Sequence, residues 1–200
     1  MASNSSLFSS ARDMFLKYGV KSVSMDDIAR ILGISKKTIY QSVTNKKNLI
    51  QSVIEAFVEE EHKAIRQITL ESSDAVDEMI IIANHVLKSM KKMNPKLTFD
   101  LKKYYPVTWS YVENHHFSYI EEVIQKNLIR GKKEGYYRQE INEVILSKMY
   151  VGMAHLIVNE HIFSFREYEL STLFAIYIEY HLNGILNDKG REIFNHYSQI

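Results

Sequence analysis

Hydrophobic residues recur at intervals of three and four positions along most of the chain, which is the spacing of one face of an α-helix. No long stretch of residues has the alternating pattern of a β-strand, and the 200 residues include only two Pro and seven Gly. We therefore predict an all-α protein. Helices are expected over residues 7–18, 25–32, 36–42, 46–70, 75–92, 99–104, 106–130, 141–158 and 170–180, with a polar loop between Gly131 and Gly135 and a short helix or tail from residue 187 on.

The stretch from residue 24 to residue 47 carries the strongest local signals. Ser24 can cap a helix, and Asp27 three positions later can complete a capping box. Gly33 follows the apolar stripe of that helix, at a position where a tight turn favours a residue that tolerates positive φ. Ser35 is the next N-cap candidate, and Ile39 is expected to point inward from a second short helix. This order of signals predicts a helix-turn-helix.

The outer face of the second helix differs from its inner face. Its side chains can all donate hydrogen bonds and none is acidic, as expected for a helix that enters the major groove of B-DNA. We assign Lys37, Thr38 and Gln41 to base edges, because Lys can donate to guanine and Gln can pair with adenine. The outer face consists of Lys36, Lys37, Thr38, Tyr40, Gln41 and Ser42.

Residues 7–57 resemble the TetR family of transcriptional regulators. The resemblance is carried by Phe15, Tyr18, Gly19, Ile28, Ala29 and the run GISKKTIY at 33–40. It implies phosphate contacts from Tyr40 and Lys46, to which we add Lys36 and, on the charge of the following helix start, Lys47. It also implies a repressor that binds a pseudo-palindromic operator as a homodimer and is released by a small-molecule effector. The chain departs from the usual family pattern at Lys37, Gln41, Val43 and Lys47, which affects the DNA sequence it would read.

The domain organisation follows from the helix-turn-helix and from the charge. We expect a DNA-binding domain over residues 1–46 and a helical effector-binding and dimerisation domain over residues 47–200. Residues 1–50 hold eight Lys and Arg against three Asp and Glu, whereas residues 51–200 hold 17 against 21, so the first part is basic and the rest acidic. A basic head suits phosphate attraction, although short windows also gain such an excess by chance.

The last two long segments, 141–158 and 170–180, are apolar around most of their circumference. A helix of this kind must be buried on most sides. In the TetR resemblance these two helices form a four-helix bundle with those of a second subunit, which predicts a homodimer. The alternative is that one of them is a central helix buried within the monomer.

An aromatic stretch between residues 104 and 119 is the best candidate for a ligand site. Aromatic rings with polar tips suit an apolar pocket that contains a few orienting hydrogen bonds. From this stretch we name Tyr105, Trp109 and His116 as ligand-binding candidates. The alternative is that these rings belong to the hydrophobic core.

Other functions have little support in the sequence. There is no Cys, no HExxH motif, no phosphate-binding Gly-rich loop and no nucleophile elbow, so we expect no metal site, no cofactor and no enzymatic activity. No apolar run is long enough to cross a membrane, and the N-terminus lacks signal-peptide features, so a cytoplasmic protein is expected. Two functions remain: a dimeric regulator that binds double-stranded DNA, and a helical dimeric interaction protein whose head does not read DNA.

Overall fold

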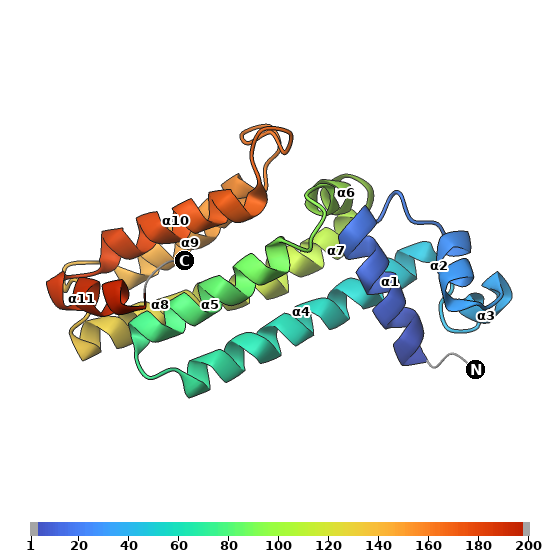
Figure 1. Ribbon diagram of the computed structural model, residues 1–200. Helices are drawn as coiled ribbons and strands as arrows, with labels where there is room; N and C mark the ends of the chain where they lie inside the picture. Colours follow the sequence, from blue (N-terminus) through green and yellow to red (C-terminus); the bar gives the residue numbers. More distant parts are fainter. Residues whose placement is uncertain (1–3, 198–200) are drawn as a thin grey trace. The chain divides into compact units, whose positions relative to one another are not determined.

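The computed structural model describes residues 4–197 (Figure 1). A helix covers most of each segment that was expected to be helical. The prediction of an all-α fold is confirmed. The helices are α1 (Asn4–Tyr18), α2 (Met25–Leu32), α3 (Lys36–Tyr40), α4 (Lys46–Glu71), α5 (Ala75–Met90), α6 (Lys96–Tyr104), α7 (Pro106–Tyr111), the π-helical turn η1 (Val112–Phe117), α8 (Ser118–Glu134), α9 (Glu143–Ile157), α10 (Leu170–Ile185) and α11 (Asp188–His196).

The chain divides into two compact units. One unit joins the chain up to residue 61 with residues 92–116, and the other joins residues 62–91 with the chain from residue 117 onward. Helix α4 therefore contributes residues to both units. The first unit covers the predicted DNA-binding residues and also contains α6 and α7, which no pattern in the sequence groups with them.

In the first unit, α1 packs on α2 and on α6, and α2 packs on α3. Gly19 ends α1 with a φ of +80°, in the left-handed region where a side chain is strained. The side chain of Asn94 then closes that helix end, because its Nδ2 donates to the Lys17 carbonyl oxygen at 3.2 Å. The core of this unit includes Leu7, Ala11, Phe15, Ile28, Ile39, Leu49 and Ile50.

In the second unit, α8 packs on α5 and α9, and α10 packs on α5 and α9. Figure 1 shows α9 and α10 running side by side along the green and yellow helices α5 and α8. A cluster of Ile65, Ile82 and Val123 joins α4, α5 and α8. Among the described residues, no helix is long and apolar enough to span a membrane.

The polar loop predicted between Gly131 and Gly135 is wrong, because α8 continues through Gly131 to Glu134. Gly131 is buried against the ring of Tyr137, and a Cβ on this glycine would lie 2.2 Å from a ring carbon. The glycine is thus needed for a close approach inside a helix and does not break it. Gly135, with a φ of +75°, is the residue that ends α8.

Smaller differences lie at helix ends. Helix α3 ends at Tyr40, because the Gln41 and Ser42 amides donate to Thr38 and Ile39 in a tighter turn. Helix α6 begins three residues earlier than expected, at Lys96, whose amide donates to Asn94 Oδ1. The helix predicted from residue 106 contains a π-helical turn at 112–117, and α10 runs five residues beyond the predicted end at residue 180.

Candidate nucleic-acid interface

The predicted helix-turn-helix is formed by α2 and α3. Ser24 Oγ accepts the Asp27 amide at 3.2 Å while the Asp27 carboxylate accepts the Ser24 amide at 3.0 Å, which is the expected capping box. Gly33 has a φ of +65°, and the next amide, that of Ile34, donates to the Ala29 carbonyl oxygen at 3.0 Å. Together these bonds end α2 and set the direction of the turn.

Helix α3 is fixed from the inside and leaves its outer face exposed. Ser35 Oγ accepts the Thr38 amide at 3.1 Å and so caps the helix start. Ile39 is fully buried, and Val43 beyond the helix end is buried as well. The exposed side chains are those predicted to meet DNA, namely Lys36, Lys37, Thr38, Tyr40 and Gln41. A short, rigidly seated helix with donors outward has the form that a DNA-reading element requires.

Lys36 forms an ion pair within the first unit that no pattern in the sequence indicated. Its Nζ lies 2.8 Å from Asp26 Oδ2, and this hydrogen bond and the attraction between the charges raise the pKa of Lys36. Both side chains are exposed, so the ion pair contributes little stability and can exchange for another anion. A phosphate at Lys36 would have to displace Asp26, which makes Lys36 the least available of the predicted phosphate contacts.

The start of α4 carries the remaining two predicted contacts, Lys46 and Lys47. Asn45 caps the helix, since its Oδ1 accepts the Asn48 amide at 3.0 Å. Lys47 is exposed, whereas Lys46 is half-buried, and burial lowers the pKa of Lys46 against the opposing attraction of Asp100 and Asp27. No acidic residue lies in the first turn of α4, so this helix end presents the positive pole of its dipole together with two lysines.

Two residues of α6 form hydrogen bonds with Lys21, which follows α1, and no sequence pattern indicates these contacts. Asp100 is buried, and its Oδ2 accepts the Lys21 amide at 3.2 Å. The Lys21 Nζ donates to Tyr104 Oη at 3.0 Å, and this bond lowers the pKa of Tyr104. These contacts join positions about 80 residues apart, so no local pattern could indicate them.

The three predicted ligand-binding residues all lie in the first compact unit, Tyr105 and Trp109 at the junction of α6 and α7 and His116 further along in η1. Tyr105 is half-buried, and its carbonyl oxygen accepts the Trp109 amide at 3.0 Å. Trp109 is buried, with the Lys102 ammonium 4.6 Å from the centroid of its ring. His116 is half-buried in the π-helical turn, a type of turn that is frequent at functional sites.

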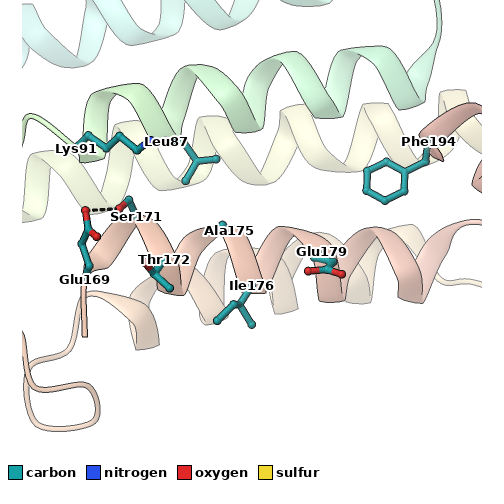
Figure 2. Close-up of a pocket in the computed structure, with 9 residues that line it drawn as sticks. All are labelled: Leu87, Lys91, Glu169, Ser171, Thr172, Ala175, Ile176, Glu179 and Phe194. Carbon is teal, nitrogen blue, oxygen red and sulfur yellow. Dashed lines mark hydrogen bonds between the residues drawn. The ribbon is translucent and has the colours of Figure 1, made fainter. Parts of the chain in front are cut away.

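The second unit carries two hollows on either side of the first half of α10. One has a volume of about 890 Å³ and lies between α5, α10 and α11, with Leu87, Lys91 and Phe194 facing the α10 residues (Figure 2). The other, of about 680 Å³, lies between the end of α9, the connection after it and α10. Both have Glu169, Thr172 and Ile176 in their walls.

An apolar surface extends over α9 and α10 of this unit. Met149 is 62%, Ile176 60% and Tyr180 74% exposed, values that are high for large apolar side chains. Val144, Ile145 and Leu156 of α9 are exposed as well. These side chains lie on two helices that pack on each other, and large apolar patches that stay exposed often mark binding surfaces. Within residues 4–197, no group of three His, Asp or Glu side chains is placed to hold a metal ion.

Comparison with known proteins points in the same direction. Residues 7–53 match the family model described as bacterial regulatory proteins, tetR family. The chain is 25% identical over 174 residues, 84% of its length and 88% of the relative's, to the uncharacterized HTH-type transcriptional regulator YvaF of Bacillus subtilis.

Two solved structures share the fold over nearly the whole chain. A TetR-family transcriptional regulator from Agrobacterium tumefaciens superposes with a TM-score of 0.74 at 17% identity, over 90% of this chain and 96% of the other. The fatty acid degradation regulator FadR from Bacillus halodurans gives a TM-score of 0.67 at 20% identity, over 89% of this chain and 93% of the other. At these identities the likeness concerns the fold.

Proposed function

We propose that this chain is a transcriptional repressor of the tetR family of bacterial regulatory proteins, whose family model its residues 7–53 match. It binds a pseudo-palindromic operator as a homodimer and leaves it when a small-molecule effector binds. It acts in the cytoplasm and is not an enzyme. The observation that carries the proposal is the exposed, donor-rich face of α3, seated on the fully buried Ile39.

The DNA contacts divide into two kinds. Lys37 and Thr38 of α3 and Gln41, the residue after this helix, are exposed, and we assign them to base edges in the major groove. Tyr40, Lys46 and Lys47 are assigned to phosphates, with Lys36 joining them once its bond to Asp26 exchanges. A phosphate at the start of α4 would meet both lysines and the positive end of the helix dipole.

Lys47→Glu and Gln41→Ala should weaken DNA binding in different ways. Lys47→Glu removes a positive charge near phosphates, so we expect weaker binding to every DNA sequence and a shallower salt dependence. Its effect on folding should be neutral or slightly stabilising, because an acidic residue suits a helix start. Gln41→Ala should instead relax preference at one base position, by about 1–3 kcal/mol.

Titrations of operator and unrelated DNA at several salt concentrations separate these two effects. Lys133→Glu, the same charge change in α8 of the other unit, is the control and should leave the salt slope unchanged. An equal operator affinity and salt slope for Lys47→Glu and the parent would remove Lys47 from the contact set.

We assign the apolar surface of α9 and α10 to the interface with a second subunit. Two-fold symmetry of the protein is mirrored by the half-sites of an operator, so dimerisation is part of DNA recognition. We expect a dimer at micromolar concentration by light scattering. The double substitution Ile145→Asp with Met149→Asp places charge on exposed positions of α9, and it should give a folded monomer.

Ile31→Asp is the matched control for this experiment. Ile31 is also exposed, but it belongs to α2 of the first unit. A monomeric parent protein, or a double variant that remains as dimeric as Ile31→Asp, would overturn the assignment of this surface.

The effector is assigned to the region of Tyr105, Trp109 and His116. An effector can release DNA only if it prefers one arrangement of the protein over the other. Helix α4 is the expected lever, because it contributes to both units and carries Lys46 and Lys47 at its start. Trp109 is the only Trp in the chain, so its fluorescence reports on this region alone. Effectors that release DNA should change that fluorescence, and release without any change would place the effector elsewhere.

A further inference from the structure

Two segments of the first unit, residues 14–25 and 92–112, contain six lysines and only one acid, Asp100. Asp100 is buried, so the charge that these segments present to solvent is positive. The chain beyond residue 50 is acidic as a whole, which makes the second segment an exception. Four of the six lysines, all of them exposed, form what we call the lysine surface of α1 and α6: Lys17, Lys21, Lys96 and Lys103.

The side chain of Asn94 brings the first two of these lysines together. Its Nδ2 donates to the Lys17 carbonyl oxygen at 3.2 Å, and its Oδ1 accepts the Lys96 amide at 2.9 Å. The Asn94 amide also donates to the Leu16 carbonyl oxygen at 2.6 Å. These three bonds fix the start of α6 against the end of α1, so Lys17 and Lys96 leave the backbone at neighbouring points.

The ring of Tyr104 brings the other two lysines together. The Lys21 ammonium lies 4.6 Å and the Lys103 ammonium 5.5 Å from the centroid of this ring. Lys21 Nζ also donates to Tyr104 Oη at 3.0 Å. Lys96 and Lys103 are seven residues apart on α6, so they lie on one face of that helix. The two pairs therefore belong to one surface.

The lysine surface differs from the basic residues of the second unit in its partners. There the ammonium groups are paired with carboxylates, as in the ion pairs of Lys126 with Glu122, Lys132 with Glu143 and Lys148 with Glu121. Within residues 4–197, no Asp or Glu forms an ion pair with the four lysines of the surface, and Asp100 Oδ2 accepts a backbone amide, that of Lys21. Like charges that gather in this way repel each other, and a bound anion removes the repulsion.

The form of the surface indicates which anion it suits. A lysine ammonium is a point charge that accepts a phosphate in many orientations, whereas arginine binds it in a fixed fork. The four lysines are exposed and line neither of the two hollows beside α10, so they cannot surround a small anion. They suit a long chain of phosphates, and double-stranded DNA carries one negative charge per about 1.7 Å of its axis.

We propose that the lysine surface of α1 and α6 binds the phosphate backbone of DNA, in addition to the contacts of α3 and of the start of α4. This binding is independent of base sequence, because it involves phosphates alone. It raises the affinity for any DNA, whether or not the DNA contains an operator. The inference rests on the proposed function in that its ligand is DNA, but it needs neither an operator nor an effector.

A triple variant, Lys17→Gln with Lys96→Gln and Lys103→Gln, tests the proposal. Lys21 is kept because it also holds Tyr104. Binding of the full chain to unrelated DNA is titrated at several salt concentrations. At about 0.1 M salt the triple variant should bind about tenfold more weakly, and its salt slope should be shallower by about two, as expected when two or three phosphate contacts are lost. Its thermal unfolding should match that of the parent, since the three side chains are exposed.

The matched control removes the same charge from exposed positions of the second unit, with Lys126→Gln, Lys133→Gln and Lys148→Gln. It should keep the affinity and the salt slope of the parent. A triple variant that binds unrelated DNA as the control does would overturn the proposal. Binding of the parent to phosphatidylglycerol vesicles that the triple variant loses, with DNA binding unchanged, would assign the surface to a membrane and would also overturn it.

The same titrations in the background Lys37→Ala with Gln41→Ala separate this inference from the proposed function. The loss caused by the triple variant should persist there, because the lysine surface reads no bases. A parent that binds unrelated DNA through the lysine surface, but shows no preference for the DNA upstream of its own gene, would contradict the repressor function alone. A parent with that preference and a triple variant without any loss would contradict this inference alone.

Discussion

Replacing Arg130 by Met should lower the free energy of unfolding by about 3 kcal/mol, which is a large share of the 5–15 kcal/mol typical of folded domains. Glu78 is only 2% exposed, and its Oε2 lies 3.1 Å from Arg130 Nη1. The same guanidinium contacts Glu134 Oε1 at 2.7 Å and donates to the Ser72 carbonyl oxygen at 3.1 Å. Its loss leaves a carboxylate buried without its cation, which is the costly way to break such a pair.

The lower end of the usual range applies because part of the Arg130 side chain still reaches solvent. Thermal unfolding at a fixed protein concentration should show a fall in Tm of about 6–12 °C for a chain of this size. Lys126→Met, on the same helix, breaks only an exposed pair with Glu122 and should change stability by less than about 0.5 kcal/mol. Adding Glu78→Gln to Arg130→Met should recover part of the loss, since it removes the buried charge. If Arg130→Met were as stable as Lys126→Met, the contacts of Arg130 with Glu78, Glu134 and Ser72 would make no net contribution to stability.

Stability should also fall as the pH drops below about 6.5, and His181 should account for much of the fall. His181 is 8% exposed on α10, with its ring against Tyr150 and Tyr177 and its Nε2 buried without a hydrogen-bond partner. Burial lowers the pKa of His181 from 6.5 to about 4. The folded protein therefore holds this ring neutral, while the unfolded chain takes up a proton near pH 6.5.

The direction of this change in stability with pH follows from which state binds the proton. Because the folded pKa is the lower one, the contribution of His181 to stability is fully present above pH 6.5 and is lost as the pH falls towards 4. A shift of that size corresponds to a loss of about 3 kcal/mol at most. Denaturant unfolding of the parent and of His181→Phe is compared between pH 7 and pH 4.5. The difference between the two proteins isolates the loss due to His181, because the carboxylates contribute equally to the pH dependence of stability in each. His196→Phe, an exposed position, is the control. Parallel stability curves for the parent and His181→Phe would contradict the prediction.

The helix-turn-helix could be predicted from the sequence because its determinants are local. The capping box of Ser24 and Asp27 and the turn at Gly33 lie within ten residues, and each appears in the structure as expected. The exposed donors of α3 follow from the burial of Ile39 in a five-residue helix. Local chemistry therefore determines the element on which the proposed DNA contacts lie.

Features that depend on distant contacts could not be predicted. Gly131 looked like part of a loop because polar residues follow it, and only the ring of Tyr137 explains why a helix needs glycine there. The bond between Asp100 and Lys21 and the pair of Arg130 with Glu78 each join segments more than 50 residues apart. The hollow between α9 and α10 includes Phe163 and Tyr168 from the connection between these helices, which has no helical periodicity, so no pattern in the sequence indicated it.

Binding of the full chain to the DNA upstream of its own gene, measured by gel shift against excess unrelated DNA, tests the central claim most directly. If α3 reads an operator, a discrete complex should form that survives the competitor, weakens steeply with salt and is lost in the variant Lys37→Ala with Gln41→Ala, which leaves the core of the head intact. Binding that the competitor abolishes equally for the parent and the variant, from a protein that is folded and dimeric, would contradict the account. That result would favour the alternative of a helical interaction protein whose head does not read DNA.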